Sequence, residues 1–164
     1  MHLILSYFHS KRGPELFLSF PDEVPEKISD KMKGFFDLDM IDPFFEVTLI
    51  EEKIKITNLY FEITSCWARG SKEMVMLSLV IEKDYKSELF YDILKEYSLK
   101  IISIVNIYKS FYDRGFLQKN DPEIDIKKKE LVQILVECLD RLNKLNKSDF
   151  EGEKIIQKFK KFKW

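Results

Sequence analysis

The sequence predicts an α+β fold in which helices cover a five-stranded antiparallel sheet. Two observations predict it. Five segments rich in β-branched and aromatic residues have the length and boundaries of strands, and three segments carry apolar residues at helical spacing. The strand segments are residues 2–9, 15–20, 44–50, 53–63 and 74–81. One helical segment follows the second strand and two follow the fifth, so the expected order is strand, strand, helix, three strands, helix, helix.

Length and composition limit the class of protein. The chain has 164 residues, of which 45% are hydrophobic and 34% charged, which fits one globular domain. A net charge of -1 does not indicate a surface that binds nucleic acid. Two cysteines are too few for a disulfide framework, which favours a reducing compartment. No apolar run reaches the roughly 18 residues of a membrane span. We therefore expect a cytoplasmic protein that binds no nucleic acid.

The first three elements are indicated by turn residues and spacing. Between the first two strands lies His9-Ser10-Lys11-Arg12-Gly13-Pro14, which predicts a hairpin with Pro14 at a strand start or an edge. From Pro25 onward Ile28 and Met32 recur at helical spacing, followed by Phe35 and Phe36. Pro suits the first turn of a helix because its missing N–H is not needed there, so a short helix is expected.

The next three strands differ in their exposure. Residues 53–57 alternate strictly between polar and apolar, which predicts a half-exposed strand, and the carboxylates Glu51 and Glu52 before it indicate a solvated hairpin. Residues 74–81 are almost wholly apolar. Such a strand is expected in the middle of the sheet, covered on both faces.

Two helices are expected after the last strand. Asp84 is the predicted cap of the first, which should end near residues 113–115. Its buried face should comprise Leu89, Ile93, Tyr97, Ile101, Ile104, Tyr108 and Phe111, widened by Phe90, Leu94 and Val105. Asp121-Pro122-Glu123 opens the second helix. Its apolar stripe is Leu131, Ile134, Leu135, Cys138, Leu142 and Leu145. The predicted domain covers residues 1–146.

This order of elements resembles a longin domain, and two short motifs narrow the resemblance: one opens the chain and the other precedes the fifth strand. Ser6-Tyr7-Phe8-His9, Gly13-Pro14 and Pro21-Asp22-Glu23-Val24 are similar to the opening of the nitrogen permease regulator-like proteins. The resemblance implies one helix on one face of the sheet and two on the other. It also implies a protein that binds and regulates a Ras-like small GTPase. In that family one member carries an arginine finger in the loop between the fourth and fifth strands.

Arg69 is the residue that matches this arginine. The family pattern is aromatic, small, Arg, Asn before an apolar strand, and here it is Trp67-Ala68-Arg69-Gly70, with Gly in place of Asn. An arginine finger offsets the charge of a phosphoryl group in transfer, for which a permanent, planar cation is suited. The alternative is a solvated arginine, or one paired with Glu73. Trp67 and Gly70 are candidate partner-binding residues, although Trp67 is equally suited to covering a sheet edge.

The last residues, 147–164, form a separate basic amphipathic tail in this interpretation. From Lys154 to Trp164 there are five lysines and no acid, with apolar residues at helical spacing. Lys158, Lys160, Lys161 and Trp164 are the residues expected to contact an anionic membrane surface or a partner. The alternatives are a solvated tail or a helical turn that docks on the domain.

The sequence predicts no catalytic cluster, no cofactor and no metal site. His2 and His9 are an odd number of residues apart and so lie on opposite faces of one strand, and the chain has no Gly-Lys-Ser/Thr phosphate loop. We therefore expect a regulatory or binding protein rather than an enzyme. Its partner would be a Ras-like small GTPase or another longin- or roadblock-type protein, with a homodimer or heterodimer formed through a sheet edge. The alternative is a vesicle-trafficking or tethering adaptor that leaves nucleotide turnover unchanged. A small-molecule enzyme or sensor has no supporting polar constellation.

Overall fold

The computed structural model describes residues 1–38, 41–113 and 120–161, and side chains as far as residue 148. Its strands are β1 His2–His9, β2 Gly13–Phe20, β3 Phe44–Leu49, β4 Ile54–Thr64 and β5 Lys72–Glu82. Its α-helices are α1 Glu26–Lys33, α2 Tyr91–Ser103 and α3 Glu123–Lys161. Short 3₁₀ helices are η1 Gly34–Asp37, η2 Ser87–Phe90 and η3 Ile107–Phe111. The predicted α+β class and order of elements are confirmed.

The five strands form one antiparallel sheet in the order β2-β1-β5-β4-β3. Strand β5 lies in the middle, paired with β1 on one side and β4 on the other, as its continuous apolar sequence predicts. The alternation of side chains along β5 places Leu77 and Leu79 on one face and Met76 and Val80 on the other. Strands β2 and β3 are the edges of the sheet, and Pro14 is the second residue of edge strand β2.

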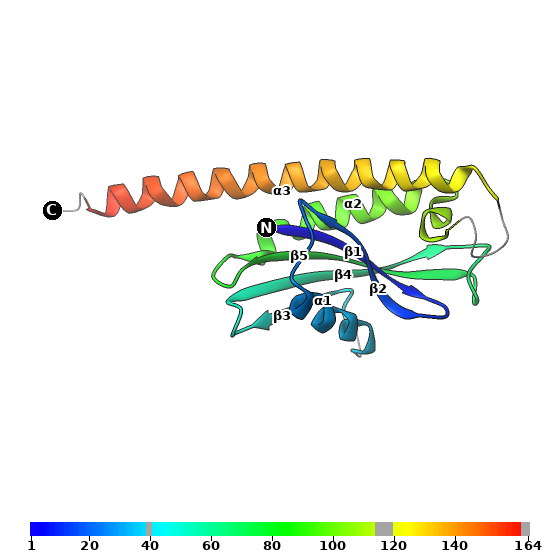
Figure 1. Cartoon of the computed structure of the whole chain (residues 1–164). Helices are drawn as coiled ribbons and strands as arrows, with labels where there is room; N and C mark the ends of the chain where they lie inside the picture. The colour runs from blue at the N-terminus through cyan, green and yellow to red at the C-terminus, as the bar shows by residue number, and fades with distance from the viewer. Residues whose placement is uncertain (39–40, 114–119, 162–164) are drawn as a thin grey trace.

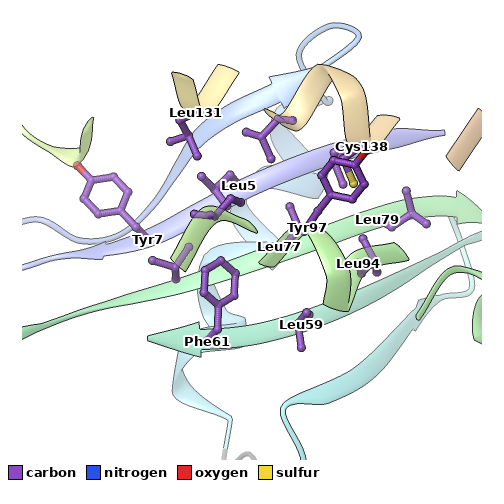
Figure 2. Close-up of a cluster of buried hydrophobic side chains, with 14 of the residues drawn as sticks. Leu5, Tyr7, Leu59, Phe61, Leu77, Leu79, Leu94, Tyr97, Leu131 and Cys138 are labelled. Carbon is purple, nitrogen blue, oxygen red and sulfur yellow. The ribbon is translucent and has the colours of Figure 1, made fainter. Parts of the chain in front are cut away.

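The helices divide between the two faces of the sheet: α1 covers one, and α2 and α3 together cover the other (Figure 1). Beneath α2 and α3 lies the larger hydrophobic core, in which side chains from β1, β4 and β5 meet those of both helices (Figure 2). Leu131, Leu135, Cys138 and Leu142 of the predicted α3 stripe are buried there, and Ile134 and Leu145 pack at its margin. Burial of the Cys138 thiol raises its pKa to about 12.

The single helix expected from Asp84 to residues 113–115 is wrong. The chain there forms η2, α2 and η3, and the break follows Ser103, where Ile104 is extended and Asn106 adopts a left-handed φ of 60°. Asn tolerates that conformation better than the β-branched residues around it. No side-chain cap is made by Asp84, since Lys86 and Phe90 precede η2 and α2. The break also changes which residues are buried: Leu89 is 44% exposed and Val105 75% exposed, against the expected stripe.

The predicted boundary at residue 146 does not coincide with the end of a helix. Helix α3 continues to Lys161 and extends beyond the sheet toward the C-terminus (Figure 1). Lys158, Lys160 and Lys161 are therefore part of α3, with side chains outside the described set, and Trp164 lies outside the described residues. Within the described residues, no helix is both long enough and apolar enough to span a membrane.

Candidate functional site

The candidate site is the loop of residues 65–71 between β4 and β5, which contains Arg69. The loop is closed at its base, where the Ser65 N–H donates to the Ser71 carbonyl at 2.9 Å. At its tip the Ser71 N–H donates to the Ala68 carbonyl at 3.1 Å. Gly70 has a φ of +91°, which residues with a side chain rarely adopt, although a Cβ there would have open space around it. Gly70 is thus suited to the turn by its backbone conformation.

Hydroxyl and carboxylate groups hold the loop from its buried side. The Ser65 hydroxyl donates to Glu73 Oε1 at 2.6 Å and accepts from the backbone N–H groups of Trp67 at 3.2 Å and Ala68 at 3.0 Å. The Tyr112 hydroxyl also donates to Glu73 Oε1 at 2.6 Å. Burial and the Glu73 carboxylate raise the pKa of Tyr112 well above its ordinary value. Ser65 and Glu73 are themselves buried, so the loop has a rigid inner support.

Trp67 fixes the loop against the segment that follows α2. Its ring makes edge-to-face contacts with Tyr108 and Tyr112, with centroids 5.5 and 5.3 Å apart, and it is half-buried. The Lys109 ammonium lies over the same ring, 5.5 Å from its centroid. These contacts pack Trp67 against η3 and Tyr112, and its role in binding a partner stays a prediction.

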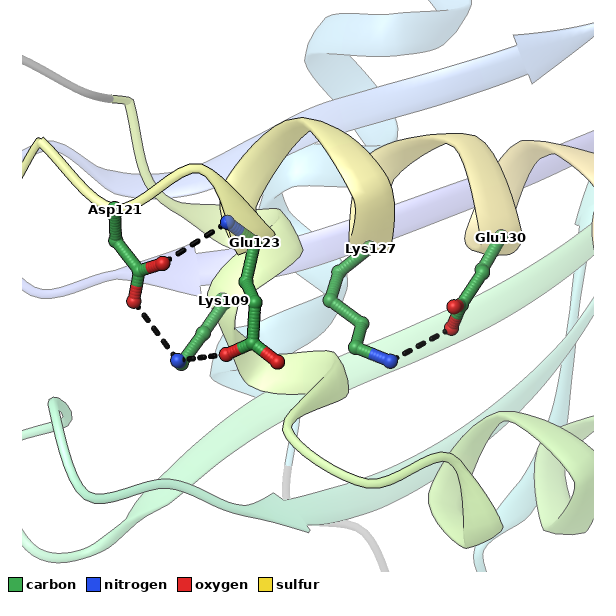
Figure 3. Close-up of polar contacts among 5 residues, drawn as sticks. All are labelled: Lys109, Asp121, Glu123, Lys127 and Glu130. Carbon is green, nitrogen blue, oxygen red and sulfur yellow. Dashed lines mark hydrogen bonds and ion pairs between the residues drawn. The ribbon is translucent and has the colours of Figure 1, made fainter.

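Lys109 extends this support to the start of α3. Its ammonium lies 2.8 Å from Asp121 Oδ2 and also pairs with Glu123 (Figure 3). Asp121 accepts a hydrogen bond from the Glu123 N–H at 2.9 Å, so it supports the helix start as its sequence predicts. The two carboxylates raise the pKa of Lys109 well above its usual range. Four segments are thereby joined: the loop, η3, the residues before α3, and α3 itself.

Arg69 is exposed at the tip of this supported loop. It makes no hydrogen bond or ion pair with any residue that the structure describes. The alternative pairing with Glu73 is wrong, because that carboxylate is 6% exposed and is bound to Ser65 and Tyr112. The site therefore presents an arginine side chain to solvent from a loop whose backbone is fixed by internal contacts.

Other residues considered from the sequence have different roles. His2 Nε2 lies 2.7 Å from Asp22 Oδ1, and buried His9 accepts backbone N–H groups of Lys11 and Arg12 through Nδ1. Among the residues described, no cluster suited to a metal ion is found. The hairpin carboxylates are not merely solvated, since Glu52 pairs with two lysines of α1.

Sequence reasoning missed Ser65, Glu73 and Tyr112 as support for the loop. One signal was available for Glu73: it is two residues before Val75 and four before Leu77, so alternation along β5 places it on the same face as the core. An acid on an inward-facing position is unusual enough to indicate a specific partner. Ser65 and Tyr112 are 47 residues apart, and nothing local in the sequence predicts their meeting.

No protein-family model matches this chain, and the comparison with curated proteins finds no match either.

Proposed function

We propose that this chain is a longin-type interaction module that binds and regulates a Ras-like small GTPase, with Arg69 as an arginine finger. The fold supports the proposal at a general level, since a five-stranded antiparallel sheet with one helix on one face and two on the other is compatible with a longin domain. The two short motifs at the start of the chain and before β5 support it at residue level.

The observation that carries the proposal is the state of Arg69. An arginine that is exposed and has no partner among the described residues, on a loop held by buried contacts, is available to a bound protein without first breaking an internal ion pair. Because the backbone on both sides is fixed, the side chain loses less freedom on binding than it would on an unsupported loop. These are the properties that an arginine supplied in trans requires.

The chemistry that Arg69 would supply is electrostatic. In GTP hydrolysis negative charge is spread over the oxygens of the transferring phosphoryl group. An inserted guanidinium stabilises this charge and raises the rate of hydrolysis by a factor on the order of 10³–10⁵. The planar guanidinium donates to several oxygens together, whereas an ammonium acts as a point charge. Arg69 would not form a covalent bond, and the GTPase would supply the nucleotide, its metal ion and the attacking water.

The test is single-turnover GTP hydrolysis by a panel of purified Ras-like GTPases at saturating amounts of this protein. Arg69→Lys should remove most of the acceleration, while binding to the GTPase survives because one residue is a small part of an interface. The matched control is Arg141→Lys, which changes an arginine on α3 that pairs with Glu96 at 2.5 Å. Stimulation should be unchanged in that control.

Equal stimulation by wild type and Arg69→Lys would exclude the finger. Binding without any stimulation by either protein would favour the alternative, a trafficking or tethering adaptor of the longin type.

One specific observation favours that alternative. An open apolar depression of about 450 Å³ lies on the α1 side of the sheet. Phe36, Leu38 and Ile41 line it from the segment between α1 and β3, and the sheet contributes Phe8, Tyr60 and Met74. Leu38, Ile41 and Met74 are exposed, and Ile41 is the most exposed large apolar side chain among the described residues. An apolar segment of a partner would bury them, and the edge strands β2 and β3 offer backbone groups for pairing. Ile41→Asp should then abolish adaptor binding without affecting GTP hydrolysis.

A further inference from the structure

We infer that Ser65 and Glu73 are positioning residues for Arg69, because they hold the backbone from which its side chain extends. This inference rests on the proposed function. Neither residue is exposed, and neither would touch the GTPase. They act on the backbone that leads to Arg69. Ser65 is four residues before it, directly after β4, and Glu73 is four residues after it, near the start of β5.

The hydrogen-bonding capacity of Ser65 is fully used in this arrangement. A hydroxyl has one donor and two acceptor lone pairs. The donor of Ser65 goes to Glu73 Oε1, and the two lone pairs accept the N–H groups of Trp67 and Ala68. Because the Ser65 O–H group donates to Glu73, the lone pairs of the hydroxyl oxygen point toward the loop. The direction of the Ser65 hydroxyl, and with it the path of the next three residues, is therefore set by Glu73.

Glu73 is itself held by a second donor from another part of the chain. The Tyr112 hydroxyl reaches the same Oε1 atom at 2.6 Å, and no ion pair joins Glu73 to a cation of the described residues. A buried carboxylate is costly unless its hydrogen bonds are satisfied, so its place is strongly determined by these two hydroxyls. Tyr112 also contacts Trp67, so the same residue supports the loop through a ring and a hydroxyl.

As a consequence, the backbone from which the long Arg69 side chain extends is held in place. Trp67 and Ala68 immediately precede it and are held by Ser65, while the Ser71 N–H closes the turn on its other side. For a group that must meet a transition state, a displacement of about 1 Å costs on the order of 100-fold in rate. Loss of the Ser65 hydroxyl should therefore reduce stimulation although Arg69 itself is intact.

The first measurement is amide hydrogen exchange in the full chain, which needs no partner. Ser65→Ala should accelerate exchange of the Trp67 and Ala68 amides by about 2- to 10-fold, which corresponds to loss of one net hydrogen bond each. Ser65→Thr keeps the hydroxyl and should restore protection. The matched control is Ser98→Ala, which removes a hydroxyl of similar burial on α2, bonded to the Lys95 carbonyl at 2.8 Å. Unchanged exchange in Ser65→Ala would overturn the inference.

The second measurement separates positioning from general destabilisation. With a GTPase that wild type stimulates, Ser65→Ala should lower the saturating single-turnover rate by about 10-fold or more while the half-saturating concentration is unchanged. In an Arg69→Ala background the same substitution should cause no further loss, because its effect passes through Arg69. If Ser65→Ala lowers the single-turnover rate equally in the wild-type and Arg69→Ala backgrounds, the positioning role is overturned.

Failure of the inference and failure of the proposed function are distinguishable. If wild type stimulates a GTPase and Ser65→Ala stimulates it equally, the function stands and the inference is wrong. If wild type stimulates none, the proposed function fails, and the exchange measurement alone decides whether Ser65 and Glu73 set the loop. Glu73→Ala is the second variant for either readout, and its melting temperature shows whether it remains folded.

Discussion

The two faces of the sheet are built differently. On the face covered by α2 and α3, apolar side chains from three strands and both helices form one continuous core that includes Leu79 and Ile101, each 0% exposed. The face covered by α1 has a small cluster of buried apolar residues. These are Ile4, Met32, Phe35, Ile56, Met76 and Val80.

The α1 face also contains polar contacts. Asn58 and Ser78 are fully buried there, and the Ser78 hydroxyl donates to Asn58 Oδ1 at 2.6 Å. From α1, Lys27 and Lys31 lie 2.8 and 2.9 Å from Glu52 Oε1 at the β3–β4 turn. The comparison indicates that α2, α3 and the sheet form the unit of greatest stability. Helix α1 is attached by fewer apolar contacts, so it should open at lower free energy than the rest.

The largest expected effect is the loss of unfolding free energy when a buried side chain is shortened to Ala, and this loss should differ between the two faces. Leu79→Ala and Ile101→Ala should each lower the free energy of unfolding by about 2–5 kcal/mol, because both side chains are enclosed by the larger core. Met32→Ala should cost about 2 kcal/mol, at the low end of that range, because short helix α1 can move to fill the space. Urea-induced unfolding at equilibrium measures all three.

Two results would contradict this prediction. Losses below about 0.5 kcal/mol at both Leu79 and Ile101 would place the core elsewhere, since exposed positions show effects of that size. A loss at Met32 larger than at either of them would reverse the comparison between the faces.

A smaller effect is expected from the ion pairs that hold α1. Hydrogen bonds from Lys27 and then Lys31 lower the pKa of Glu52 from 4.5 to about 2. Because the folded-state pKa is depressed, the contribution of Glu52 to stability is fully present above pH 4.5. It is lost as the pH falls from 4.5 toward 2. Wild type should therefore be more stable than Glu52→Gln at pH 7, and the difference should disappear near pH 2.

Thermal melting of both proteins across this pH range measures the difference. Glu51→Gln is the comparison variant, because Glu51 also pairs with Lys27, at 3.1 Å, but its side chain is 79% exposed against 14% for Glu52. It should show little pH-dependent difference from wild type. A constant gap between wild type and Glu52→Gln from pH 7 to pH 2 would show that the ion pairs are not its cause.

The smallest effect on stability is expected at the end of α3. Deletion of residues 154–164 should leave the free energy of unfolding within about 0.5 kcal/mol of wild type, because the buried residues described in α3 end at Leu142. If the basic segment contacts membranes, the same deletion should abolish salt-sensitive binding to anionic vesicles. Sedimentation with vesicles at low and high salt checks this. If the intact protein does not bind such vesicles at low salt, the membrane proposal is excluded. A large loss of stability on deletion would show that the segment is part of the folded domain.

Strands were predictable because their signals are local. The alternation and β-branched content of residues 2–9 and 74–81 depend only on neighbours in sequence, and both strands occur where they were expected. The helical region after β5 was less predictable. The apolar spacing continues through Val105, yet the chain leaves the helix after Ser103, and the gain is burial of Tyr108, Phe111 and Tyr112 against β1 and the β4–β5 loop. That gain depends on the tertiary structure, which local spacing does not encode.

The candidate site divides in the same way. Arg69 and Gly70 were proposed because the resemblance points to the loop between the fourth and fifth strands, and both strands are clear in the sequence. The support for the loop was not found, because it joins Ser65, Glu73 and Tyr112 from three segments of the chain through one carboxylate oxygen of Glu73. Alternation along the strand could have predicted that Glu73 points into the core. It could not have predicted which residues bind Glu73.

The length of α3 determines how far apart two bound partners would be. Its 39 residues span about 58 Å at about 1.5 Å per residue. One end is joined through Lys109 to the support of the Arg69 loop, and the other, at Lys161, lies on the opposite side of the molecule (Figure 1). A compact domain of about 150 residues has a radius of gyration of only about 15 Å. A protein held at the loop would therefore leave the far end of the helix uncovered, and the helix would act as a spacer of fixed length between the two attachments.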